Sequence, residues 1–134
     1  MNKDIDIVIY GATGFTGKLC VKYFQSLDLD IKWAIAGRNL GKLKNIASNI
    51  SPNIEILVAD SDDEKGLRDI CSRSKVVLST AGPFHRYGSK LVAACIENDT
   101  NYVDITGENF WVKELIEKHH EAVSYTHLRA HETP

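Results

Sequence analysis

The chain has 134 residues, a formal net charge of −2 at neutral pH and a sequence pI of about 6.2. This length corresponds to about one domain, and roughly two-thirds of the unfolded surface is buried at this size. The slightly acidic balance provides no electrostatic attraction to nucleic acid or to an anionic membrane, so we expect neither as a partner. Any ligand has to be inferred from a site.

Two features bear on the cellular compartment. No apolar run approaches the roughly 20 residues that cross a bilayer, and the start MNKDIDIVIYG lacks the basic segment and cleavage site of a signal peptide. We therefore expect a cytoplasmic protein. The three cysteines, Cys20, Cys71 and Cys95, lie far apart in apolar helical patterns. This favours buried reduced thiols over disulfides or a CxxC site.

Short runs rich in β-branched residues alternate along the chain with helical patterns. The runs are IDIVIY (5–10), IKWAIA (31–36), IEILVA (54–59), KVVLS (75–79) and NYVDI (101–105). Strands that are apolar along their whole length are buried on both faces, which requires a parallel sheet covered by helices. The sequence therefore predicts an α/β fold with a Rossmann-like doubly wound sheet of five parallel strands in the order 3-2-1-4-5. Ligands bind such sheets at the carboxyl ends of the strands.

The segments between these runs carry helix signals. The first helix is predicted from Gly14 to Leu27, because Phe15, Leu19, Tyr23 and Leu27 recur at intervals of four. Two later helices have N-terminal signals. Asn39 precedes LGKLKNIASNI, and the Ser61 and Glu64 of SDDE can form a capping box.

The first strand-to-helix turn contains three glycines, Gly11, Gly14 and Gly17, in the stretch GATGFTG. At such a turn the free N–H groups and the positive dipole end of the helix form an anion site. A missing Cβ also lets a pyrophosphate approach the backbone. The spacing differs from GxGxxG, and a tight turn that binds nothing is the alternative. Its position between a strand and a helix favours a dinucleotide site.

The end of the second strand bears on the choice of cofactor. An NAD-binding domain usually has Asp or Glu there to bind the ribose 2′-hydroxyl. This chain reads AGRN, with Arg38 where a 2′-phosphate would lie, so NADP is favoured over NAD. A solvent-exposed arginine beside a helix N-cap is the alternative. After the third strand, Asp60 either lies at the adenine rim or complements the dipole of the next helix.

Motifs at the last two strand ends carry a family resemblance. The stretch LSTAGPFHRYGSKLVAACIENDTNYVDITGE, together with GATGFTG and AGRN, resembles the cofactor domain of the saccharopine dehydrogenase-like oxidoreductases, which include the trans-acting enoyl reductases. The GPF..YG and YVD.TGE patterns are more specific than the glycines, and the resemblance covers residues 5 to about 120. It implies an NADP-binding domain of an oxidoreductase that transfers hydride between NADP(H) and a small organic or lipid-like substrate.

The resemblance also implies where NADP is bound. The implied contacts are Gly11, Ala12, Thr13, Gly14, Phe15 and Thr16 at the pyrophosphate, Arg38 at the adenosine phosphate, and Ala81, Gly82 and Pro83 beside the nicotinamide half. Gly17 completes the glycine turn, and Asp60 is the candidate at the adenine. Independently, Gly82-Pro83 is a fixed turn at a strand's carboxyl end, where backbone would line a flat ring.

Other polar residues near these motifs have weaker functional interpretations, and the sequence identifies no catalytic residue. Tyr87 and Lys90 are three positions apart, whereas the Tyr-Lys couple of short-chain dehydrogenases needs four, so packing or a loop hydrogen bond is favoured for Tyr87. Asp104 and Glu108 frame DITGE at the fifth strand end, where capping and support of the site are favoured over catalysis.

The histidines do not predict a metal site. His119 and His120 are adjacent and thus about 100° apart on a helix, so they cannot share a metal as an i, i+4 pair can. We expect them at the surface.

The segment VSYTHLRAHETP (123–134) departs abruptly from the amphipathic pattern before it and resembles the translation of a transposon-type sequencing adapter. We therefore expect residues 1–122 to form an NAD(P)-binding domain, incomplete at its C-terminal end, and 123–134 to be a non-native tail that packs little. The resemblance implies a second domain, missing here, that recognises the substrate and closes over the nicotinamide. The chain alone is therefore expected to be inactive. A homodimer is left open.

Two other classes of protein share the glycine turn. An NmrA-like NADP sensor would bind the cofactor without catalysis, and an extended short-chain dehydrogenase or epimerase would have its Tyr-x-x-x-Lys further along the chain. The GPF..YG and YVD.TGE pair favours the oxidoreductase family over both.

Overall fold

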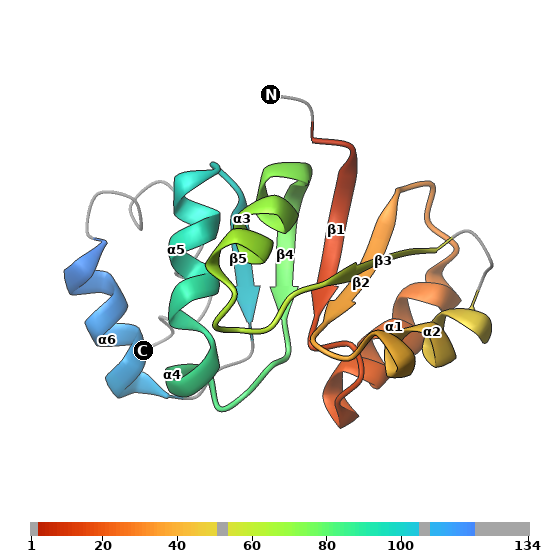
Figure 1. The fold of residues 1–134 in the computed structure, drawn as a ribbon, viewed down its shortest axis with the longest axis horizontal. Coiled ribbons are helices and arrows are strands. Elements are labelled where there is room, and N and C mark those ends of the chain that lie inside the picture. The colour runs from red at the N-terminus through yellow and green to blue at the C-terminus, as the bar shows by residue number, and fades with distance from the viewer. Residues whose placement is uncertain (1–2, 51–53, 105–107, 120–134) are drawn as a thin grey trace.

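The computed structural model describes residues 3–50, 54–104 and 108–119. Figure 1 shows one central sheet with helices packed against it. The strands are β1 (Ile5–Tyr10), β2 (Trp33–Gly37), β3 (Glu55–Val58), β4 (Ser74–Ser79) and β5 (Asn101–Asp104). The helices are α1 (Phe15–Leu27), α2 (Leu40–Ser48), α3 (Glu64–Arg73), α4 (Phe84–Tyr87), α5 (Ser89–Glu97) and α6 (Asn109–Lys118).

The sheet has the predicted topology. Its strand order is β3-β2-β1-β4-β5, and all four neighbouring pairs are parallel. The chain builds outward from β1 to β3, then crosses through α3 to the other side of β1. This reversal creates a crevice at the carboxyl ends of β1 and β4, where doubly wound sheets bind ligands. Tyr10 pairs with both Ala36 and Ser79, so the turns after these strands begin at one level.

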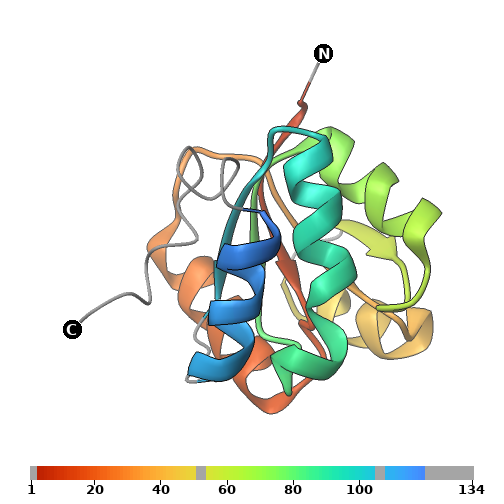
Figure 2. The same ribbon diagram turned by 90° about the vertical axis from the view of Figure 1, so that its left-hand side faces the viewer.

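Two layers of helices cover the two faces of the sheet. On one face, Leu67 of α3, Leu91 of α5 and Trp111 of α6 pack in one core with Val77. On the other face, α1 and α2 form a smaller core around Ile9 and other buried residues. Figure 2 shows α1 and α5 on opposite sides of the sheet. Neighbouring residues of the inner strands enter opposite cores, as Val8 and Ile9 of β1 and Ala34 and Ile35 of β2 do, which is expected for a sheet buried on both sides.

The first predicted helix is confirmed, with Gly14 as its N-cap. The row of residues that predicted it does not pack, however, because Phe15, Leu19 and Tyr23 are 82%, 52% and 61% exposed. The buried face instead contains Gly17 and Val21. Gly17 is two positions from both Phe15 and Leu19, about 200° around the helix, so α1 packs through the face opposite to the predicted row.

One of the two predicted helix N-termini is confirmed and the other is wrong. Asn39 caps α2 as predicted, and its side chain accepts a hydrogen bond from the Lys42 N–H at 3.0 Å. The predicted capping box of Ser61 and Glu64 is wrong. Asp63 is the N-cap of α3 and accepts from the Gly66 N–H at 3.0 Å. Glu64 is therefore the first helical residue, not the third, and is out of position for a capping box.

The end of the sheet opposite the crevice is held by a lysine. The Lys3 ammonium donates to the carbonyl oxygens of Cys71, Ser74 and Asn98 at 3.2, 3.0 and 2.7 Å, and to the Thr100 hydroxyl at 2.6 Å. A positive charge at the C-terminal ends of α3 and α5 is favourable, because it interacts with the last carbonyl groups and with the negative ends of the helix dipoles. It also fixes β1 against both helices, far from the crevice.

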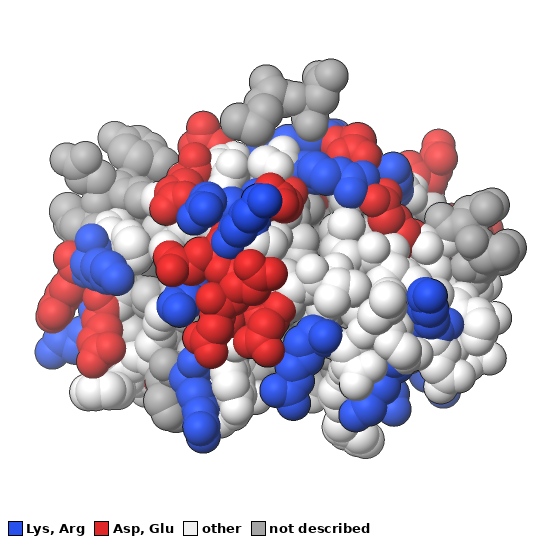
Figure 3. Space-filling view, in the orientation of Figure 1, with Lys and Arg blue, Asp and Glu red and all other residues white. Residues whose placement is uncertain are grey.

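Acidic and basic side chains are interspersed on the face that carries α3 and α5 (Figure 3). The exposed residues Asp60, Asp62, Asp63 and Glu64 form an acidic patch over the start of α3. None of the helices within the described ranges is long and apolar enough to span a membrane.

The buried thiols give a test of the packing between α3 and α5. Cys71 and Cys95 are buried with their Sγ atoms 3.5 Å apart, whereas Cys20 is half-buried. The hydrogen bond with Cys71 and burial together raise the pKa of Cys95 well above its usual value.

Because the thiolate is the reactive form and both thiols are buried, we expect neither Cys71 nor Cys95 to be alkylated in the native protein at pH 8. Unfolding in urea should make all three reactive. Mass spectrometry after iodoacetamide treatment checks this, and rapid native labelling of Cys95 would contradict the packing.

Candidate functional site

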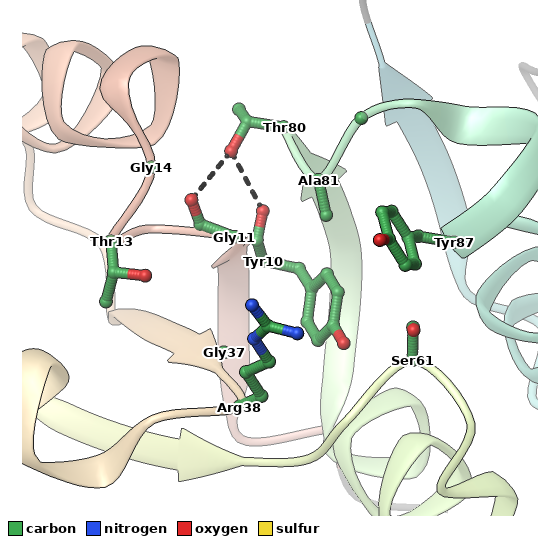
Figure 4. Close-up of a pocket in the computed structure, with 11 residues that line it drawn as sticks. Tyr10, Gly11, Thr13, Gly14, Gly37, Arg38, Ser61, Thr80, Ala81 and Tyr87 are labelled. Atoms are coloured by element: carbon green, nitrogen blue, oxygen red, sulfur yellow. Dashed lines mark hydrogen bonds between the residues drawn. The ribbon is translucent and has the colours of Figure 1, made fainter.

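A cavity of about 220 Å³ opens in the crevice at the carboxyl ends of the strands (Figure 4). Its lining residues are Tyr10, Gly11, Thr13, Gly14, Gly37, Arg38, Ser61, Thr80, Ala81, Gly82 and Tyr87. They come from the last residues of β1 and β2, from the turns after β1, β2, β3 and β4, and from α4. Typical small-molecule sites enclose roughly 300–1,000 Å³. This cavity is therefore smaller than a typical site for a whole drug-sized ligand.

The glycine turn and the end of β4 are in direct contact. Gly11 has φ +83°, and a Cβ there would lie 2.9 Å from the Ala81 nitrogen. The Thr80 hydroxyl donates to the carbonyl oxygens of Tyr10 and Gly11 at 3.1 and 3.0 Å (Figure 4). Gly11 is thus required by its left-handed conformation and by the close approach of a neighbouring chain segment. The contact holds the two walls of the cavity at a set distance.

The surroundings of Gly14 and Gly17 differ in whether they leave room for a Cβ. A Cβ at Gly17 would collide with the carbonyl oxygen of Gly11 and lie 2.8 Å from the Ala12 Cα, so the fold itself requires glycine there. A Cβ at Gly14 would have the Gly11 oxygen at 3.5 Å as its only neighbour among the described atoms, which is an ordinary contact. Gly14 also lines the cavity. A Cβ there would fill space that a pyrophosphate needs to approach the backbone.

The first turn of α1 presents unpaired donors beside this space. Among the described residues, the backbone N–H groups of Phe15, Thr16 and Gly17 have no hydrogen-bond acceptor, and the first helical bond is from Lys18 to Gly14 at 2.9 Å. The first turn contains no acidic residue. Free N–H groups at the positive end of a 13-residue helix bind anions such as phosphate. The residues present therefore fit a dinucleotide pyrophosphate.

Arg38 supplies the positive charge of the site. It follows the last residue of β2, and Figure 4 shows its guanidinium pointing toward the glycine turn beside the Tyr10 ring. Among the described residues that line the cavity, Arg38 alone carries a charged side chain. The nearby acidic patch disfavours anions, so Arg38 provides the local attraction for a phosphate group.

Tyr10 forms a neutral wall of the cavity. Its hydroxyl donates to the Ala59 carbonyl oxygen at 3.0 Å, and its side chain is buried. Burial, with a smaller contribution from the charge of Asp60, raises the pKa of Tyr10 far above its usual value. The phenol therefore stays protonated over the physiological pH range and contributes a fixed apolar surface.

The structure brings together part of the predicted residue set. Gly11, Thr13, Gly14, Arg38, Ala81 and Gly82 line the cavity. The other predicted residues are outside the lining: Ala12 and Gly17 are buried, Thr16 is half-buried, and Phe15, Asp60 and Pro83 are exposed. Asp60 accepts from the Asp62 N–H at 3.1 Å, an interaction at the start of α3.

Several lining residues were missed by reasoning from the sequence. Tyr10 and Gly37 end β1 and β2, and Thr80 directly follows β4. The predicted topology could have identified these three, because strand ends meet at one edge of the sheet. Ser61 and the half-buried Tyr87 enter from loops and a short helix, where no periodic signal existed. Lys90, the other residue considered with Tyr87, does not line the cavity, and its Nζ lies 3.5 Å from Oδ1 of Asp62.

The two acidic residues of DITGE contact protein groups beyond the cavity. Asp104 is buried and accepts from the Tyr102 hydroxyl at 2.5 Å. Glu108 accepts from the Phe84 N–H at 2.6 Å. His119, at the end of α6, is half-buried, which lowers its pKa. His120 lies outside the described residues. In the part of the chain that the structure describes, no three His, Cys, Asp or Glu side chains gather as a metal site.

The parallel sheet, the glycine turn and the anion-binding start of α1 define a Rossmann-type dinucleotide-binding domain. A family model described as the saccharopine dehydrogenase NADP binding domain matches residues 7–128. The chain belongs to this family, which confirms the resemblance inferred from its motifs, and the family's cofactor is NADP.

Relatives of known name share this sequence over most of its length. A trans-acting enoyl reductase of Mycobacterium leprae is 38% identical over 130 residues, which cover 95% of this chain and 31% of the relative. A lipid droplet localized protein of Caenorhabditis elegans is 37% identical over 123 residues, 85% of this chain and 29% of the relative. The chain thus spans less than a third of the length of these relatives.

Solved structures share the fold at lower identity. Saccharopine dehydrogenase (L-Glu forming) from Saccharomyces cerevisiae has a TM-score of 0.67 at 20% identity, covering 83% of this chain and 24% of that one. A short-chain dehydrogenase/reductase from Veillonella parvula in complex with NADP has a TM-score of 0.63 at 15% identity, covering 82% and 50%. These likenesses confirm the Rossmann-like fold. Residues 123–134 lie outside the described ranges, so their packing stays a prediction.

Substituting the two glycines separates folding from ligand binding. We expect Gly17→Ala to lower the free energy of unfolding by about 1–3 kcal/mol, because the new methyl group collides with backbone. Gly14→Ala should lower it by less, at most about 1 kcal/mol, since its Cβ meets only ordinary contacts and the cost is limited to the weaker preference of an N-cap for alanine. Gly14→Ala should nevertheless weaken NADP binding by about tenfold or more, because the methyl group occupies the pyrophosphate space. Urea unfolding and calorimetric titration measure the two effects. Equal losses of stability would contradict this distinction.

Proposed function

We propose that this chain is the cofactor half of an oxidoreductase that transfers hydride between NADP(H) and a small organic or lipid-like substrate. The observation that carries the proposal is that one cavity is lined both by Gly14, at the start of α1, and by Arg38, directly after β2. A pyrophosphate and a 2′-phosphate are two anions of the same cofactor. The distinct sites for them at α1 and β2 support NADP as the occupant.

The pyrophosphate would bind at the start of α1. The N–H groups of Phe15, Thr16 and Gly17 would donate to its oxygens, and the space at Gly14 would allow the backbone to approach. In this proposal Phe15 and Thr16 contribute backbone groups. Their side chains therefore need not line the cavity.

The 2′-phosphate would bind to Arg38. A guanidinium donates paired hydrogen bonds to phosphate oxygens and keeps its charge at all relevant pH values. The turn after β2 contains no acid to bind a ribose 2′-hydroxyl, as NAD would require. Asp60 remains a candidate contact at the rim, where the adenine would lie.

The nicotinamide end would lie against the loop after β4. Ala81 and Gly82 line the cavity there with backbone and a single methyl group, and Tyr87 closes the far side. NADP would supply the hydride chemistry, while the protein binds, orients and shields it. We propose no catalytic acid or base among these residues. Tyr87 stands at the edge of the site as a packing residue.

The nature of the substrate is inferred from the relatives. An enoyl reductase and a lipid droplet localized protein have names that refer to acyl and lipid chemistry, which supports a lipid-like or enoyl substrate. The chain spans less than a third of either relative. We infer that most of the substrate site is built by sequence corresponding to the rest of those relatives.

Substitution of Arg38 tests the choice of cofactor. A charge-assisted hydrogen bond contributes about 1.5–3 kcal/mol, so Arg38→Ala should weaken NADP binding by about 10- to 150-fold. NAD binding should change far less, because NAD lacks the 2′-phosphate. Raising the ionic strength should reduce NADP affinity of the wild type more than NAD affinity. Calorimetric titration of both cofactors measures these differences.

A matched control is Arg68→Ala, which removes an exposed arginine of α3 outside this cavity. It should leave both affinities within about twofold of the wild type, since exposed charges away from the site contribute little. Equal losses for NADP and NAD in Arg38→Ala, or a wild type that prefers NAD, would overturn the assignment of Arg38.

A turnover measurement tests the inference that this chain binds the cofactor but does not form the substrate site. We expect the chain of 134 residues to bind NADPH without oxidising it in the presence of an enoyl thioester or a carbonyl compound. The reason is our inference that the nicotinamide is covered and the substrate bound mainly by sequence corresponding to the rest of the relatives, of which this chain spans less than a third. Absorbance at the NADPH band, with free cofactor as the blank, measures this. Catalysed oxidation would show that the described site is sufficient for the reaction.

A further inference from the structure

The loop that would face the nicotinamide is fixed at both ends. At its start, Thr80 donates through its N–H to the Tyr10 carbonyl oxygen at 2.9 Å and through its hydroxyl to the Tyr10 and Gly11 carbonyl oxygens. At its end, the Phe84 N–H donates to Oε2 of Glu108 at 2.6 Å. Between these two points, Ala81 and Gly82 line the cavity.

We propose that Glu108 is a positioning residue that sets the nicotinamide end of the cofactor site through its hydrogen bond with Phe84. This inference rests on the proposed function, because it assigns the loop of Ala81 and Gly82 to the nicotinamide. Glu108 does not line the cavity. Its effect on the cofactor is therefore exerted through the loop.

The carboxylate of Glu108 supplies an acceptor that the loop lacks. Phe84 is the first residue of α4, and the N–H groups of a first helical turn have no acceptor within the helix. Pro83 occupies the N-cap position and makes no side-chain capping bond. The acceptor comes instead from a residue 24 positions later in the chain. A charged acceptor forms a shorter and stronger hydrogen bond than a neutral one.

The first turn of α6, which follows Glu108, also contacts the Phe84 side chain. Trp111 lies three residues after Glu108 and is buried, and its ring packs against Phe84 with centroids 6.0 Å apart and planes at 22°. The indole N–H donates to the Ser89 hydroxyl at 2.9 Å. A Cβ at Gly88 would lie 2.8 Å from both the Phe84 carbonyl oxygen and the Trp111 ring. The start of α6 is therefore packed tightly against α4 and α5. This packing fixes the position of the Glu108 backbone relative to Phe84.

This arrangement predicts that the two ends of the cofactor site respond differently to Glu108. The loop of Ala81 and Gly82 depends on it, whereas Arg38 follows β2 on the other side of β1. Removing the Glu108 carboxylate should therefore loosen the nicotinamide end and leave the adenosine end unchanged. NADP⁺ probes both ends, and 2′,5′-ADP probes the adenosine end alone.

The experiment compares Glu108→Ala with Glu108→Gln, whose amide oxygen can still accept from the Phe84 N–H. Glu114→Ala is the matched control, because it removes an exposed carboxylate of the same helix. Hydrogen exchange of the cofactor-free chain is followed in peptides that cover residues 80–88, with β2 as the internal reference. Calorimetry measures NADP⁺ and 2′,5′-ADP binding, and fluorescence emission of bound NADPH reports the surroundings of the nicotinamide.

Glu108→Ala should raise exchange in residues 80–88 but not in β2. It should weaken NADP⁺ binding by about tenfold, because the loosened loop has to be ordered again when the cofactor binds. Binding of 2′,5′-ADP should stay within about twofold. The emission of bound NADPH should shift toward that of the free cofactor. Glu108→Gln should recover most of each loss, and Glu114→Ala should behave as the wild type.

Three results would overturn the proposal. They are unchanged exchange in residues 80–88, a uniform rise that includes β2, and equal losses for NADP⁺ and 2′,5′-ADP in Glu108→Ala. A wild type that binds neither nucleotide would instead refute the proposed function. The exchange measurement needs no nucleotide, so it would still decide whether Glu108 holds the loop.

Discussion

The close approach between the turn after β1 and the end of β4 is the constraint on which this site depends. These strands are neighbours only because the chain reverses direction across the sheet after β3. Gly11 adopts a positive φ and has no Cβ, and both properties let Thr80 and Ala81 pack against it. Thr80 then ties the two turns together through its hydroxyl. The turn after β1 and the loop after β4 therefore form two walls of the cavity, which lies between the start of α1 and the carboxyl ends of the strands.

The three glycines of the turn have separate physical roles. Gly11 and Gly17 are required by the protein's own backbone, since a Cβ at either would meet backbone atoms at less than contact distance. A Cβ at Gly14 would make only an ordinary contact, with the Gly11 carbonyl oxygen at 3.5 Å. Rossmann turns combine requirements of folding and of binding in one short stretch, and here the two can be assigned to different residues. Stability and cofactor affinity can therefore be changed independently.

The charges of the site oppose one another. The acidic patch at the start of α3 lies near the cavity and disfavours an anionic ligand, while Arg38 and the free N–H groups of α1 attract one. Because the attractive groups are localised, they distinguish phosphates by position, and a diffuse basic surface would not. The loop after β4 adds no charge to the cavity lining, and its end donates a hydrogen bond to Glu108 through the Phe84 N–H. In the proposed site, specificity for NADP is thereby separated from orientation of the nicotinamide.

The sequence by itself determined the parallel sheet, its strand order, the glycine turn and Arg38 at the end of β2, because each follows from local periodicity or from its place in a strand-to-helix connection. Only the tertiary structure decided which face of α1 is buried, that Asp63 caps α3, and that Tyr87 reaches the cavity. The pairing of Glu108 with Phe84 belongs to the same group. These features depend on contacts between segments far apart in the chain, and no local pattern of residues encodes which distant groups will meet.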